Sequence, residues 1–92
     1  MDYLELASRH RPSTFSGSSD PVVFDNWAYQ MERIFEYISC PPERQVLVAT
    51  RYFGDAALYW WRTRRQDLTA EPGFGWEQLT RAMRLHFFTP ET

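Results

Sequence analysis

Apolar residues recur at steps of three and four along two long stretches of the chain, which predicts two amphipathic helices. The first stretch follows Asp20 and Pro21, a favourable N-cap and first helical position, and ends before the prolines Pro41 and Pro42. The second runs from about Trp76 to Phe87. The apolar positions are Phe24, Trp27, Met31, Ile34, Phe35 and Ile38 in the first stretch, then Trp76, Leu79, Met83 and Phe87 in the second.

Two shorter helices are expected between them. One begins near Pro42 and ends at Gly54, with its buried side supplied by Val46, Leu47, Ala49, Thr50 and Phe53. The next is capped by Asp55, carries Trp60 and Trp61, and finishes in the arginines of residues 62–65, where cations favour a helix C-terminus. Residues 66–75, which contain Pro72, Gly73 and Gly75, then form a connection.

Residues 1–19 read as an extended or partly disordered arm, because Ser, Pro, Thr and Gly cluster in residues 11–19. Phe15 is the one large apolar residue in that cluster, and we expect it to pack back onto the core. Tyr3, Leu4 and Leu6 have no evident place in a four-helix core. They are disordered, form a short extra helix, or contact a neighbouring copy; together with Phe15 they are the candidate interface residues.

The predicted fold is therefore all-α: a compact bundle of four or five short helices with an N-terminal arm. Residues 20–90 form the helical lobe, Pro90 marks the end of the ordered element, and alternation typical of a strand is absent from the sequence. The predicted core consists of Phe24, Trp27, Met31, Phe35, Leu47, Phe53, Trp60, Trp61, Trp76, Leu79, Met83 and Phe87.

Length and composition narrow the class of protein. A chain of 92 residues makes one domain, and an aromatic content of 17% supplies large side chains for a small core. The net charge of -2 disfavours electrostatic capture of nucleic acid, although all ten basic residues are Arg, which suits interfaces. One cysteine excludes an internal disulfide, and no apolar run is long enough for a membrane span, so a cytoplasmic location is expected.

No set of residues converges on catalysis, and we expect no enzyme activity, cofactor or metal site. His10 and His86 are far apart in sequence and read as surface histidines, while Cys40 precedes two prolines and reads as a turn residue. Trp60 and Trp61 are candidates for a stacking platform, but core packing is favoured for at least one of them. Two sets of charged residues, weighed for RNA contact and for acid–base catalysis, are interpreted as solvent-exposed charges. They are the arginines Arg62, Arg64 and Arg65 and the carboxylates Asp25, Glu32 and Glu36.

The order and spacing of several short motifs resemble the gag domain of Ty3/gypsy-type retrotransposons and its domesticated relatives. The matching positions are Phe15-Ser16-Gly17, Asp20-Pro21, Trp27, Met31-Glu32, Phe35, Cys40-Pro41, Ala49, Phe53-Gly54-Asp55-Ala56-Ala57, Trp60-Trp61, Trp76-Glu77-Gln78-Leu79, Phe87 and Pro90. The resemblance implies the amino-terminal lobe of a capsid protein, which packs with copies of itself. It also implies an alternative, in which a domesticated lobe binds short peptides of partner proteins in an apolar groove.

The chain lacks the second capsid lobe, the Cys/His zinc knuckle and the protease motif of a complete gag polyprotein. We therefore expect one lobe of a longer product, with RNA contacted only through regions outside this chain and no membrane contact. The first functional hypothesis is a structural assembly module, and the second is a peptide-binding adaptor. A small nucleic-acid-binding domain is a third hypothesis, which the net charge disfavours.

Overall fold

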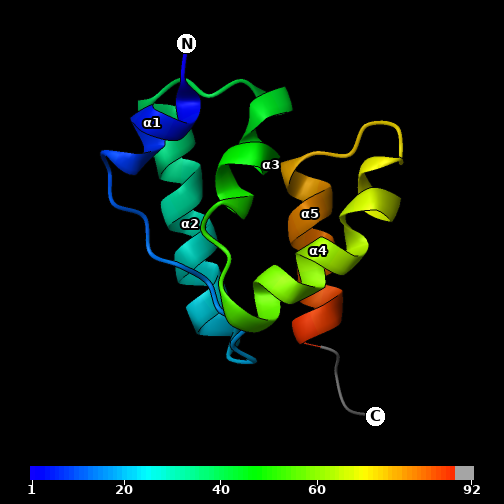
Figure 1. Ribbon diagram of the computed structural model, residues 1–92. Coiled ribbons are helices and arrows are strands. Elements are labelled where there is room, and N and C mark those ends of the chain that lie inside the picture. The colour runs from blue at the N-terminus through cyan, green and yellow to red at the C-terminus, as the bar shows by residue number, and fades with distance from the viewer. Residues whose placement is uncertain (89–92) are drawn as a thin grey trace.

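The computed structural model describes residues 1–88, which form five α-helices and no β-strand (Figure 1). The all-α prediction is confirmed, and the fifth helix is the short one in the arm. Pro90, the predicted end of the ordered element, lies outside the described residues. The helices are α1 (Tyr3–Ser8), α2 (Pro21–Tyr37), α3 (Pro42–Thr50), α4 (Asp55–Thr69) and α5 (Trp76–Phe87).

Helix α2 begins as its sequence predicts and ends in a way that the sequence did not reveal. The Asp20 carboxylate accepts a hydrogen bond from the Val22 N–H at 2.9 Å and caps the first turn. At the other end Ser39 adopts φ +52°. The Cys40 N–H donates to the Phe35 carbonyl at 2.9 Å, and the Ser39 N–H donates to Glu36. These two bonds form a Schellman motif, so the helix stops before the prolines are reached.

The N-terminal arm is ordered in its first part as helix α1, which Asp2 caps by accepting the Glu5 N–H. The chain then runs alongside α2 to reach the start of that helix (Figure 1). Phe15 forms an isolated parallel bridge with Phe53: its N–H donates to the Tyr52 carbonyl at 2.8 Å, and its carbonyl accepts the Gly54 N–H at 2.9 Å. The arm is thus attached to the α3–α4 turn by backbone bonds.

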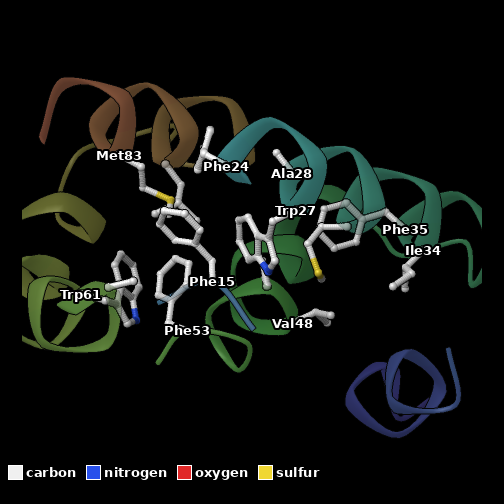
Figure 2. Packing of buried hydrophobic residues seen from close by; sticks show 14 of the residues in the cluster. Phe15, Phe24, Trp27, Ala28, Ile34, Phe35, Val48, Phe53, Trp61 and Met83 are labelled. Carbon is white, nitrogen blue, oxygen red and sulfur yellow. The ribbon is translucent and has the colours of Figure 1, made fainter. Parts of the chain in front are cut away.

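Phe15 lies in the middle of the core rather than at an interface (Figure 2). Its side chain is 1% exposed, and its ring packs edge-on against Phe24 and Phe87. Placing it among the interface candidates was therefore wrong, whereas the expectation that it packs onto the core is confirmed. The buried cluster contains Ala7, Phe15, Phe24, Trp27, Ala28, Met31, Ile34, Phe35, Cys40, Val48, Ala49, Phe53, Ala57, Trp60, Trp61, Leu79 and Met83.

Several details of the shorter helices differ from the prediction. Leu47 is 49% exposed and Val48 is fully buried, because the apolar run of residues 46–49 fits a helix in more than one rotational phase. Trp76 and Phe87 pack against the core but are only partly buried.

Helix α4 also differs from its predicted bounds. It continues to Thr69, past the predicted end near Arg65, because no helix-breaking residue occurs before Pro72. Gly54 occupies the N-cap, and Asp55, the predicted cap, is the first helical residue.

Two polar contacts hold α5 against α2. The Trp76 indole N–H donates to the Glu32 carboxylate at 2.9 Å, and Arg84 forms a 2.9 Å ion pair with Asp25. The Arg84 guanidinium also lies 4.9 Å from the centre of the Phe24 ring, over its face. These contacts are exposed, so their main effect is to fix how the two helices lie rather than to add much stability. None of the helices in residues 1–88 has the length and apolarity that a membrane crossing requires.

Candidate interaction surfaces

The outward face of α2 carries a column of stacked planar groups. Arg33 lies between Tyr29 and Tyr37, with its Cζ atom 5.7 Å and 5.4 Å from the two ring centres. Its guanidinium donates to the Tyr29 hydroxyl at 3.1 Å and also to the Tyr37 hydroxyl. The His10 ring from the arm stacks on Tyr37 at 5.5 Å and closes one end of the column. Helical spacing explains the arrangement, because residues four apart are neighbours on one face.

This column is exposed, yet its arginine is held in place. Tyr29 and Tyr37 are each 60% exposed. Hydrogen bonds to Tyr29 first and then to Tyr37 raise the pKa of Arg33 above its ordinary value, because they favour the charged guanidinium. Glu36 lies beside the column and lines the same recess, whose volume is about 300 Å³. Sequence reasoning had treated Glu36 as a solvated charge and did not find this cluster.

A second surface is a groove between α3 and α4 that apolar and polar residues line in similar measure. Its volume is about 290 Å³, and Leu47 and Val46 of α3 face Trp61 of α4 across it. Phe74, from the connection after α4, stacks on Trp61 with ring centres 6.3 Å apart. The remaining lining residues are polar or charged: Glu43, Thr50, Arg65 and Thr69. The groove thus combines apolar side chains with one acidic and one basic side chain, Glu43 and Arg65.

The Trp60-Trp61 pair is mainly core, as favoured from sequence. Trp60 is 4% exposed and Trp61 is 8% exposed. Each still reaches a groove: Trp61 reaches the one described above, and Trp60 reaches a recess between α4 and α5, where the His86 ring stacks on it at 5.6 Å. A platform that stacks nucleobases needs open ring faces, and these faces are covered by other rings.

The residues weighed for chemistry are not brought together. Cys40 is buried, and burial raises the pKa of its thiol, with a further increase from the Glu43 carboxylate, so the reactive thiolate is disfavoured. His10 and His86 stack on different aromatic side chains, Tyr37 and Trp60. Among residues 1–88 no group of three His, Cys, Asp or Glu side chains is placed to hold a metal ion. The arginines of residues 62–65 are exposed, and none forms an ion pair within the described part of the chain.

The other interface candidates of the arm are half-buried. Tyr3 and Leu4 pack against the core from α1, and Leu6 is partly exposed. Met1, Tyr3 and Leu4 form one wall of a small recess, and Arg44 and Leu47 of α3 form the other. The arm residues therefore contribute to this domain's own packing, with a partly open edge that faces α3.

Most of the chain matches one known protein family. The family model for the N-terminal capsid-like domain of the retrotransposon-derived protein PEG10 matches residues 9–88. The chain belongs to this family. No curated protein and no solved structure gives a significant match. The resemblance to a gag-derived relative is thereby confirmed. The matched range includes the Phe15 bridge and all of α2 to α5, whereas α1 of this capsid-like domain lies outside it.

Proposed function

We propose that this capsid-like domain is an assembly module that acts by self-association with other copies of itself. Membership of a gag-derived capsid-like family supports a structural role. The observation that carries the proposal is the exposure of large apolar side chains on the outward faces of two helices, opposite the core. They are Val22 (62% exposed), Tyr29 (60%) and Tyr37 (60%) on α2, and Leu58 (38%) and Tyr59 (72%) on α4.

Outward apolar groups on more than one side suit weak contacts that are repeated. One such contact buries too little surface to be stable alone, but many contacts in a closed shell act together. The compact aromatic core would keep the outward faces in a fixed relation to each other. The proposal assigns no reaction, cofactor or metal to the domain, and it assigns RNA contact to regions outside this chain because the net charge is -2.

Electron microscopy of the full-length product, with nuclease-protected RNA measured in parallel, tests this proposal. We expect particles from the wild-type protein and a loss of particles when Leu58 and Tyr59 are both changed to Asp. Circular dichroism of the 92-residue domain should show that the variant is still helical, because both side chains are exposed and neither is part of the buried core. Absence of particles from the wild-type product at every concentration would contradict the proposal.

The groove between α3 and α4 favours a second candidate function, which is capture of a short peptide from a partner protein. Leu47 is half-exposed and lines this groove, and Arg65 and Glu43 offer opposite charges in its lining. An apolar peptide with an acidic residue near one end and a basic residue near the other would match this surface. Titration of such a peptide should change the fluorescence of Trp61, and Leu47→Asp should abolish the change while leaving particle formation intact. A response that survives Leu47→Asp would exclude this groove.

A further inference from the structure

The recess on α2 presents two opposite charges that have no counter-ion. Arg33 and Glu36 both line it, together with Tyr29 and Tyr37, and all four residues come from one helix. Residues three apart lie on the same side of a helix. Within residues 1–88 neither Arg33 nor Glu36 forms an ion pair. The surface is therefore bipolar, with a cation and an anion side by side.

The two charges stay apart because the tyrosines hold the guanidinium. Arg33 uses one N–H of each terminal nitrogen for the hydroxyls of Tyr29 and Tyr37. A guanidinium has five N–H donors, so three remain for an incoming carboxylate. The phenol oxygens accept from Arg33, and each phenol retains its own O–H to donate outward. Glu36 keeps its carboxylate for an incoming cation.

A bipolar surface of this kind is complementary to itself. We propose that α2 packs antiparallel against α2 of a second copy about a two-fold axis, so that Arg33 of each copy meets Glu36 of the other. A two-fold axis that crosses the helix between positions 33 and 36 brings both pairs together at once, as an isologous contact requires. The inference rests on the proposed self-association and names one surface through which it occurs.

The charges favour a second copy over other occupants. A peptide with a single charge would satisfy either Arg33 or Glu36 and leave the other without a partner. Nucleic acid is disfavoured, because Glu36 lines the same recess as Arg33 and repels phosphate. A second copy satisfies both charges and also covers exposed tyrosine surface. Tyrosine and arginine are the residue types that most often contribute strongly at protein interfaces.

The contact is expected to be weak and sensitive to salt. One helix face buries less than the roughly 1,200 Å² of a stable interface, so association of the isolated domain requires high protein concentration. Exposed ion pairs are screened at physiological ionic strength, so added salt should weaken the association.

Charge reversal in the 92-residue chain tests the proposal. Arg33→Glu and Glu36→Arg each place like charges against each other twice per dimer, and each should weaken dimerisation about tenfold or more, as measured by sedimentation equilibrium at low salt and up to millimolar concentration. The double variant Arg33→Glu/Glu36→Arg restores opposite charges at both pairs and should recover most of the loss. If the two copies met in any other arrangement, the double variant would not bring opposite charges together, and its association would stay as weak as that of the single variants.

Arg51→Glu is the matched control for Arg33→Glu, because it makes the same change in net charge at an exposed site at the end of α3. Association equal to that of the wild type is expected for it. If both single variants associate as strongly as the wild type, the proposed α2–α2 contact is overturned, and the assembly proposal still stands. The α2 surface would also be overturned by a double variant that associates no better than the single variants, or by a wild-type domain that stays monomeric at low salt and millimolar concentration. Particle formation by the full-length product tests the assembly proposal separately.

Discussion

The backbone of Phe15 exchanges two hydrogen bonds with the residues on either side of Phe53, and the two side chains lie in one aromatic cluster. This single bridge joins an arm residue to the turn between α3 and α4. Because the arm precedes α2, the contact joins two residues that lie 38 positions apart in the sequence. The arm therefore belongs to the folded unit.

Removing the Phe15 ring should destabilise the domain strongly. Phe15 is 1% exposed and contacts Phe24, Trp27 and Phe87, so Phe15→Ala leaves a large cavity. We expect a loss of about 3–5 kcal/mol in the free energy of unfolding, measured with chemical denaturant. Tyr59→Ala, at a site that is 72% exposed, should change stability by no more than about 0.5 kcal/mol. Similar losses for both variants would mean that the arm does not enter the core.

Gly17 should be intolerant of any side chain. It has φ +97°, and a Cβ atom there would lie 2.8 Å from the Ala56 Cβ and 3.1 Å from the Ala57 backbone nitrogen. Gly17→Ala combines backbone strain with a clash against α4, and we expect it to cost about 2–4 kcal/mol.

Gly73→Ala is the natural control for Gly17→Ala. Gly73 also has a positive φ, +77°, but an added Cβ would meet no atom within 4 Å. Only the backbone cost remains, which is about 1–2 kcal/mol. Equal effects of the two substitutions on thermal unfolding would show that the arm does not approach α4 closely.

The rotational phase of α3 can be tested with two neighbouring residues. Val48 is fully buried and Leu47 is 49% exposed, so Val48→Ala should cost about 1.5–3 kcal/mol and Leu47→Ala less than about 1 kcal/mol. Denaturant unfolding of the two variants gives the comparison. A larger loss of stability for Leu47→Ala than for Val48→Ala would instead support the orientation of α3 predicted from sequence, in which Leu47 is part of the core.

Ser39 offers a stabilising substitution. It occupies the left-handed position of the Schellman motif at φ +52°, which glycine adopts without strain. Ser39→Gly should therefore raise the free energy of unfolding by about 0.5–1 kcal/mol. Ser39→Ala keeps the Cβ atom and should give no gain. A loss of stability with glycine would show that α2 ends in some other way.

The longer helices were predictable because their capping residues and the spacing of their apolar residues indicate the same bounds. Asp20 and Pro21 mark the start of α2, and its apolar residues keep one phase over 17 residues. The bounds of α5 followed in the same way from Trp76 and Phe87. Helix α3 has nine residues and a continuous apolar run, so the period does not decide which side is buried. That ambiguity is the physical reason for the error at Leu47.

The candidate surfaces were less accessible to sequence reasoning. Exposed residues follow no hydrophobic period, so the apolar pattern did not single out Tyr29, Arg33 and Tyr37. Their spacing of four was visible in the sequence, and an aromatic-Arg-aromatic series at that spacing is the signal that could have identified the column. The groove beside Trp61 depends on Phe74, which comes from a connection whose path no local pattern predicts.

Sedimentation equilibrium of the wild-type 92-residue domain, from micromolar to millimolar concentration and at two salt concentrations, tests self-association most directly. We expect the average mass to rise with concentration and salt to reduce this rise, because exposed charged groups contribute to the contact. A mass equal to that of the 11.0 kDa monomer at every concentration and at both salt concentrations would contradict it.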